Sequence, residues 1–237
     1  MLRYFIADIH LNESEPEILA YFERFLQQLP DHCELYILGD LFDYWIGDDA
    51  ITDLHISIAN QIKSLTRRGI RTFFMVGNRD FLLGKNYAKL SGMTLLPDIH
   101  IITHQHKRLM IMHGDLLCTD DKGYQRLRRI LHCGLLQKLF GFLPVWVRNK
   151  IAARMRERSQ RSNANKSLQI MDVNQKTVDE IMLHYQADIL IHGHTHRPAH
   201  IQSLLEAKNV ERFVLGAWHD KADYVVADDT IIMLKLR

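Results

Sequence analysis

Apolar residues along this chain fall into two patterns: short continuous runs, and longer stretches with helical spacing. The helical spacing predicts helices at Glu15–Leu29, with Ser14 as N-cap, at Ile51–Arg68 and at Ser167–Tyr185. The continuous runs predict buried strands at Arg3–Ala7, Leu35–Leu38, Arg71–Val76, His100–Thr103, Arg108–Met112 and Asp188–Ile191. Alternation of strand and helix predicts an α/β protein whose parallel central sheet is covered on both faces.

Two stretches depart from this alternation. Residues 122–166 carry leucines at helical intervals and, after Pro144, a second stretch with apolar residues at the same interval. They predict a helical insertion within one domain of residues 1–237. The chain then closes with three β-rich runs, Arg212–Leu215, Asp223–Ala227 and Ile231–Leu236, the last two joined by a turn at Asp228–Asp229.

Polar residues follow five of the apolar runs at the point where each predicted strand stops. Open α/β sheets bind ligands outside the carboxyl ends of their strands, so these residues should meet at one edge. Carboxylate, imidazole and amide groups without thiolate suit Mn²⁺, Fe²⁺ or Zn²⁺, and seven of them suffice for two ions. Together these groups predict metal-assisted hydrolysis. The seven residues are Asp8, His10, Asp40, Asn78, His113, His194 and His196.

Composition narrows the class of protein. Hydrophobic residues make up 47% of the 237 residues, which is typical of a globular chain. The three cysteines form no CxxC pair, which favours a reducing compartment over a disulfide framework. No apolar stretch approaches the roughly 20 residues needed to span a bilayer. We expect a soluble or peripheral protein on the cytoplasmic side, without a signal peptide.

Charge is distributed unevenly. Residues 122–166 contain twelve Lys or Arg and one acid, Glu157, a net +11 within a chain whose total is +2. Such a segment predicts an anionic partner. Its aromatic residues cluster with Leu and Val and do not alternate with Arg, which favours lipid over nucleic acid.

The ordered motifs DIH, GDLFD, GNRD, HGD and GHTH resemble those of the calcineurin-like metallophosphoesterases. The resemblance implies two mixed β-sheets in a sandwich flanked by helices, which replaces the single parallel sheet. It also implies two metal sites that share Asp40. One site would be formed by Asp8, His10, Asp40 and His196, and the other by Asp40, Asn78, His113 and His194.

One position departs from the family motif. Arg79 stands where the family usually has the histidine of GNH. A guanidinium stays charged and cannot protonate a poor leaving group, but it binds anionic oxygens in bidentate fashion. A phosphate leaves as a stable anion near neutral pH, since its second pKa is about 6. The substitution therefore favours a pyrophosphate bond as the target.

Longer motifs resemble one branch of that family, which hydrolyses UDP-2,3-diacylglucosamine in lipid A biosynthesis. They are GDLFDYWIGDD, GNRDFLLG, HGDLLCTDD, NKSLQIMDVN and IHGHTHRPAH. The resemblance implies two Mn²⁺ ions and attack of metal-activated water on the α-phosphorus, giving UMP and 2,3-diacylglucosamine 1-phosphate (lipid X). The implied catalytic residues are Asp40, Arg79, His113 and His194. The implied substrate-binding residues are Asn78, Arg79, Asp121, Ser159, Asn163, Lys166 and His194.

The basic and apolar insertion fits such a substrate. Its apolar side chains would form an acyl-binding lid or pack on the core, and its arginines would face a membrane surface or solvent. The apolar side chains are Leu127, Leu131, Leu135, Leu139, Phe140, Phe142, Trp146 and Ile151. We expect a monomer, peripheral on the cytoplasmic face of the inner membrane, that binds no nucleic acid.

Three other functions stay open at this point. Another phosphoesterase of the same fold would act on a soluble nucleotide or phosphodiester, for which the insertion is superfluous. A metal-free adaptor with this fold would use one face for protein binding, although all seven candidate ligands are present here. Nucleic-acid binding would show strong affinity for single strands that falls steeply with salt.

Overall fold

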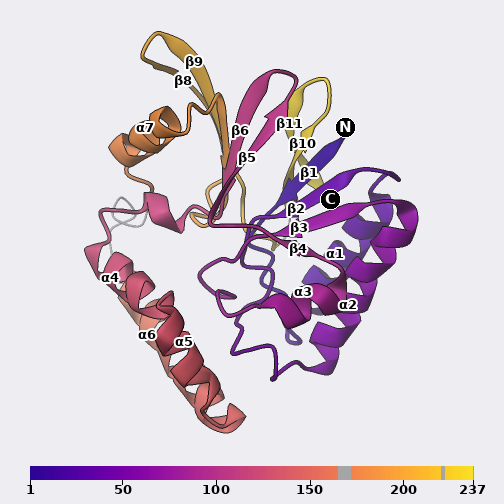
Figure 1. The fold of residues 1–237 in the computed structure, drawn as a ribbon, viewed down its shortest axis with the longest axis vertical. Helices are drawn as coiled ribbons and strands as arrows, with labels where there is room; N and C mark the ends of the chain where they lie inside the picture. The colour runs from indigo at the N-terminus through magenta and orange to yellow at the C-terminus, as the bar shows by residue number, and fades with distance from the viewer. Residues whose placement is uncertain (165–171, 220–221, 237) are drawn as a thin grey trace.

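Two mixed β-sheets packed face to face form the body of the protein (Figure 1). The computed structural model describes residues 1–164, 172–219 and 222–236, with side chains described up to residue 157 in the helix that ends at Ala164. The six-stranded sheet has the order β11-β10-β1-β2-β3-β4, and the five-stranded sheet has the order β5-β6-β7-β9-β8. The sandwich confirms the fold that the motifs implied, and the single parallel sheet expected from strand–helix alternation is wrong.

The strands that carry candidate ligands are the parallel ones. In the first sheet these are β1 (Arg3–Ile6), β2 (Glu34–Ile37) and β3 (Arg71–Phe74), and in the second β6 (Lys107–Met112) and β7 (Ile189–His192). Antiparallel pairs of β10 with β1 and β11, of β5 with β6 and of β8 with β9 make both sheets mixed, while the edge strand β4 pairs parallel with β3. The other strands are β4 (Thr94–Leu95), β5 (Ile99–His104), β8 (Ala199–Leu205), β9 (Lys208–Val214), β10 (Ala222–Ala227) and β11 (Ile231–Leu236).

The central strands of each sheet are buried on both faces, and the side-chain alternation of a strand divides the core accordingly. In β1, Phe5 points into the layer between the sheets, while Ile6 points toward the helices α1 (Pro16–Gln28) and α2 (Asp53–Leu65). The outer face of the second sheet packs against α7 (Gln175–His184) through Met110. Burial on both faces explains why these strands are continuous apolar runs and do not alternate with polar residues.

Some predicted boundaries are wrong. The helix α1 has Glu15 as its N-cap residue and Pro16 in its first turn, so Ser14 is not the cap. Of the helix expected at Ser167–Tyr185, residues 172–174 are not helical and 167–171 lie outside the described residues. The helix α7 begins at Gln175, where the side chain of Asn174 caps it by accepting from the backbone N–H of Thr177. A short helix α3 (Lys85–Ser91) and the strands β4 and β8 were not predicted.

Three helices form an arm that projects from the body beyond the strand ends (Figure 1). This helical arm consists of α4 (Lys122–Leu131), α5 (Gly134–Gly141) and α6 (Val145–Ala164), within the predicted insertion. Among its side chains up to residue 157, Arg148 is the one buried residue, at 2% exposure. Of the apolar side chains named above, none is fully buried against the core: Leu131, Phe140 and Ile151 are half-buried and the others are exposed. None of the described helices is long and apolar enough to cross a bilayer.

Charged contacts attach the arm to the body. At α6, Arg148 binds the carboxylate of Asp49 with both terminal nitrogens and donates to the carbonyl of Ile46 at 2.6 Å. At α4, Arg128 Nε lies 2.6 Å from Asp115. A purely solvated or membrane-facing role for the arginines of α6 is thus wrong for Arg148, which is buried in a contact between two parts of the chain.

Candidate metal centre

All seven predicted metal ligands lie together at one edge of the sandwich. Each lies one to four residues beyond the end of β1, β2, β3, β6 or β7. Backbone hydrogen bonds join the segments beyond the strands, for example from His10 N–H to the Asp40 carbonyl at 3.0 Å and from Gly193 N–H to the His113 carbonyl at 2.8 Å. The rule that ligands bind outside the carboxyl ends of strands thus holds for both sheets of the sandwich.

The ligand atoms form two groups. In one, His196 Nε2 lies 3.3 Å from His10 Nε2 and 3.5 Å from Asp8 Oδ1. In the other, Asn78 Oδ1 lies 2.9 Å from His113 Nε2 and 2.7 Å from His194 Nδ1. These are the two sets that the motifs implied, apart from the shared residue.

Asp40 lies between the two groups. Its Oδ2 is 3.9 Å from His10 Nε2, and its Oδ1 is 3.8 Å from His113 Nε2. One carboxylate oxygen therefore faces each set. This is the geometry that a carboxylate bridging two cations requires.

The backbone at these positions is strained. Five of the seven residues have positive φ angles between 53° and 69°: Asp8, His10, Asp40, His194 and His196. A left-handed conformation is unfavourable for residues with a Cβ and persists where the surrounding structure enforces it. The strained turns aim consecutive side chains away from the strand direction and into one site.

Two glycines leave room for these carboxylates. A Cβ on Gly77 would lie 2.2 Å from Asp40 Oδ1, and one on Gly193 would lie 2.2 Å from Asp8 Oδ2. Both distances are shorter than any contact between non-bonded atoms allows, so glycine is required there. Without a Cβ, the backbone at these two positions can pass close to the carboxylates.

Hydrogen bonds orient the buried ligands. His113 Nδ1 lies 2.9 Å from the Leu38 carbonyl and must donate to it, so Nε2 is the nitrogen that would bind a metal. Asp80, which sequence reasoning did not assign, is fully buried and accepts from the backbone N–H groups of Asp40, Leu41 and Gly77. It fixes the turn that carries Asp40. Its position directly after Arg79 in GNRD is the sequence signal that could have identified it.

The electrostatics of the site call for cations. Burial, together with the charges of Asp80 and Asp8, raises the pKa of Asp40 to about 7, even though His113 opposes this. Burial lowers the pKa of His10 to about 4 and that of His194 to about 3, so both rings are neutral ligands near pH 7. One buried ligand atom, Asp8 Oδ1, has no hydrogen-bond partner among the described residues. Divalent cations would satisfy these acceptor-rich groups, so the donor set fits the metal that the sequence implies.

The first turn of the arm reaches the centre. Asp121 caps α4 by accepting from the Tyr124 N–H at 3.0 Å, and the Tyr124 ring lies 5.7 Å from the His194 ring. Tyr124 also donates to Asp115 at 2.9 Å. Of the other predicted substrate contacts, Lys166 lies outside the described residues, and so do the side chains of Ser159 and Asn163.

A second contact joins the arm to Arg79. Arg79 Nη1 lies 3.8 Å from one oxygen of Asp43, and Arg156 of α6 pairs with the other oxygen. The Arg156 guanidinium also lies over the Tyr44 ring, 5.2 Å from its centre. Asp43 thus connects the arm to Arg79. Its place in the motif GDLFD did not by itself indicate this contact.

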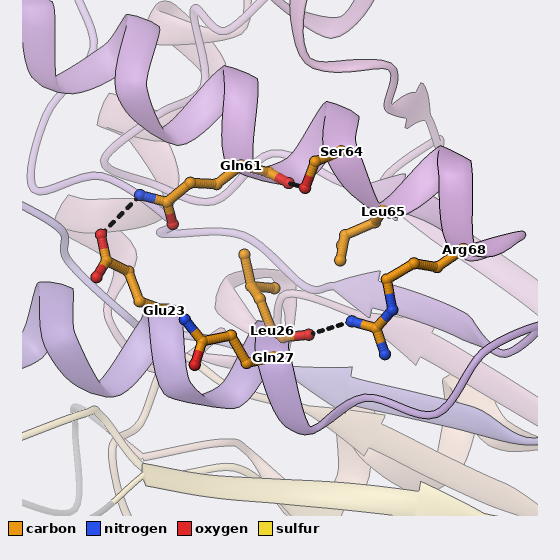
Figure 2. A pocket seen from close by; sticks show the side chains of 7 residues that line it. All are labelled: Glu23, Leu26, Gln27, Gln61, Ser64, Leu65 and Arg68. Atoms are coloured by element: carbon orange, nitrogen blue, oxygen red, sulfur yellow. Dashed lines mark hydrogen bonds between the residues drawn. The ribbon is translucent and has the colours of Figure 1, made fainter.

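Two cavities differ in their relation to the centre. A cavity of about 670 Å³ includes His10, Arg79, Arg156 and His196 in its walls, so it opens on the metal ligands. Figure 2 shows another, of about 300 Å³, between α1 and α2. There Gln61 donates to Glu23 at 2.8 Å and Arg68 donates to the Leu26 carbonyl at 3.0 Å. The second cavity lies away from all seven ligands, and its polar side chains are largely engaged with one another.

Metal ligands on strained turns, at one edge of two packed sheets, are typical of the metal centre of a phosphoesterase. The family model for calcineurin-like phosphoesterases matches residues 1–198 of this chain. The chain belongs to the calcineurin-like phosphoesterase family.

Individual relatives are similar over nearly the full length. A protein of Photorhabdus laumondii named UDP-2,3-diacylglucosamine hydrolase is 50% identical over 99% of this chain and 98% of its own. A protein of the same name from Edwardsiella ictaluri is 51% identical over 96% of this chain and 89% of its own. A third, from Escherichia coli O81, is 50% identical over 97% of both chains.

Proposed function

We propose that this protein hydrolyses the pyrophosphate bond of UDP-2,3-diacylglucosamine, giving UMP and 2,3-diacylglucosamine 1-phosphate in lipid A biosynthesis. The observation that carries the proposal is the convergence of all seven predicted ligands around Asp40, in a chain 50% identical to relatives named for this hydrolysis. The reaction adds water across the anhydride, so one phosphate receives the oxygen of water and the other leaves with the bridging oxygen.

We assign the two ligand groups to two Mn²⁺ ions. Asp8, His10 and His196 would hold one, Asn78, His113 and His194 would hold the other, and Asp40 would be shared between them. When bound, such cations lower the pKa of water and neutralise phosphate charge. Carboxylate, amide and imidazole donors together suit Mn²⁺ among the divalent metals.

Arg79 acts on the substrate side of the centre. Its guanidinium lies 3.8 Å from Asp43 and is partly exposed in the cavity wall, so it is positioned without being neutralised by a close ion pair. It binds phosphate oxygens and stabilises the negative charge that develops in the transition state. His194 and Asn78 assist from the ligand set, and Asp121, Ser159, Asn163 and Lys166 contact the head group.

The helical arm is the acyl-binding lid in this proposal, a segment inserted at residues 122–166 into a single domain. Its exposed apolar side chains include Phe142 at 85% and Trp146 at 70% exposure, on a segment of strong positive charge. A surface that is both apolar and basic suits acyl chains and an anionic membrane. We place the protein, as a monomer, at the cytoplasmic face of the inner membrane.

One experiment tests the reaction. Purified protein with Mn²⁺ hydrolyses diacylated UDP-glucosamine in water enriched with heavy oxygen, and mass spectrometry locates the label. We expect the label in UMP, because water attacks the α-phosphorus. Label in the lipid phosphate would refute the attack site. Faster cleavage of plain UDP-glucosamine than of the acylated compound would favour a phosphoesterase of soluble nucleotides.

A further inference from the structure

The cavity that opens on the metal ligands has a chemistry distinct from that of the arm. Its volume of about 670 Å³ lies in the range of small-molecule sites, roughly 300–1,000 Å³. Leu11 and Leu54 are its aliphatic side chains, and the rest of the wall is polar, charged or aromatic. An acyl chain would find few aliphatic side chains there, whereas the arm exposes many.

The proposed substrate has two unlike halves that meet at the pyrophosphate. One half is a nucleoside with hydroxyl groups and a polar base, and the other carries two acyl chains. With the pyrophosphate at the metal ligands, the acyl half fits the arm. Resting on the proposed function, we infer that the 670 Å³ cavity binds the nucleoside monophosphate half and that Glu15 accepts hydrogen bonds from its ribose hydroxyls.

The local structure fixes Glu15 relative to the metal centre. Asn12 donates from Nδ2 both to Glu15 Oε2, at 2.6 Å, and to the carbonyl of His10, at 3.0 Å. The carboxylate is thus tied through one side chain to the backbone of a metal ligand. It makes no side-chain capping bond to α1, although Glu15 is the N-cap residue.

Charge explains why this wall faces the nucleoside and not further phosphate groups. Glu13, Glu15 and Asp43 line the cavity, while its cationic side chains are Arg79 and Arg156. Ionised carboxylates repel phosphate but accept readily from hydroxyls, and an acidic side chain serves the ribose in the same way in dinucleotide-binding folds. The nucleotide would therefore enter with its single phosphate toward His10 and His196.

The test compares two ligands on the manganese-loaded protein. Isothermal titration measures binding of UMP and of 2′,3′-dideoxyuridine monophosphate, which lacks both hydroxyls. We expect the unaltered protein to bind UMP about tenfold more tightly, since a charged hydrogen bond contributes on that scale. Glu15→Gln keeps the shape and the bond from Asn12, and should reduce the difference between the ligands to less than twofold.

Glu17→Gln is the matched control. It removes the same charge from the first turn of α1, at an exposed position outside the cavity wall. It should retain the full tenfold difference. An unchanged difference in Glu15→Gln, or an equal loss in Glu17→Gln, would overturn the inference.

Hydrolysis and lipid binding separate this inference from the proposed function. If the unaltered protein fails to cleave diacylated UDP-glucosamine, the proposed function fails. If it cleaves the substrate but Glu15→Gln weakens the binding of diacylglucosamine 1-phosphate and not that of UMP, the cavity holds the acylated half of the substrate. In that case the inference alone fails.

Discussion

The body and the helical arm are held by different forces. Three clusters of buried apolar side chains build the body around and between two sheets, and most residues of its ligand-bearing strands β1, β2, β3, β6 and β7 are buried. The arm, among its side chains up to residue 157, buries an arginine and leaves its large apolar residues in solvent. The body needs nothing else to bury its core, whereas the apolar surface of the arm is available to a ligand or a membrane.

This difference suits the two tasks that we assign to the regions. A metal centre needs ligands fixed closely, and in this chain they extend from strands that are packed on both faces. A surface for acyl chains needs to admit large apolar groups. A few arginine–carboxylate contacts, at Asp49, Asp43 and Asp115, place the arm without closing it onto the core.

The largest effect is expected in the body. Asp40→Asn removes the charge that faces both ligand groups, and kcat should fall about a thousandfold. Because burial raises the pKa of Asp40 to about 7, its ionised form is unfavourable in the folded, metal-free protein. The metal-free variant should therefore melt at a higher temperature than the metal-free parent at pH 8. Exposed Asp31→Asn is the control, and near-normal turnover of Asp40→Asn would refute the two-metal assignment.

The next effect separates the arm from the body. Arg148→Met removes the buried guanidinium and leaves Asp49 largely in solvent, so no buried charge loses its partner. Hydrogen exchange at residues 134–157 should speed up by roughly tenfold to a hundredfold, the scale of charged hydrogen bonds, while the strands keep their protection. Arg154→Met, at an exposed position on the same helix, should change neither the exchange at residues 134–157 nor the protection of the strands. Faster exchange in the strands as well would show that the arm and body unfold as one unit.

The exposed apolar surface of the arm predicts weaker membrane binding when it is made polar. Phe142→Ser combined with Trp146→Ser should reduce the affinity for vesicles of anionic phospholipid about tenfold, since each side chain inserts apolar area. Leu204→Ser removes an equally exposed apolar side chain from the body and should leave vesicle binding unchanged. Vesicle flotation measures both, and equal losses would argue against the arm as the docking surface.

The smallest effect concerns the pH dependence of the body. Burial lowers the pKa of His55 to about 4, and its ring packs against Phe42 and Trp45. The unfolded chain takes up this proton near pH 6.5, before the folded protein does, so stability is lost as pH falls from 6.5 toward 4. Between pH 7 and pH 4.5, the free energy of unfolding of the parent protein should fall by roughly 1 kcal/mol more than that of His55→Gln, with partial exposure of the ring taken into account. Chemical denaturation at pH 7 and pH 4.5 measures the difference.

Much of the body followed from residue order alone. The strands before Asp8, Asp40, Asn78, His113 and His194 were predictable because burial on both faces makes them continuous apolar runs. The strand β8 was missed because its residues are mostly exposed and its turn, Glu206–Ala207, has positive φ without glycine or asparagine. The helix α3 was missed because its seven residues span too few turns to show a period.

The sequence by itself determined which residues could bind metal, because ligand chemistry belongs to the side chain and strand ends are marked by where apolar runs stop. Only the tertiary structure decided that Asp40 faces both groups, that Asp80 clamps its turn, and that Arg148 is buried while Phe142 is exposed. Those facts depend on contacts between segments 30 to 102 residues apart in the chain. Local patterns carry no record of such distant partners.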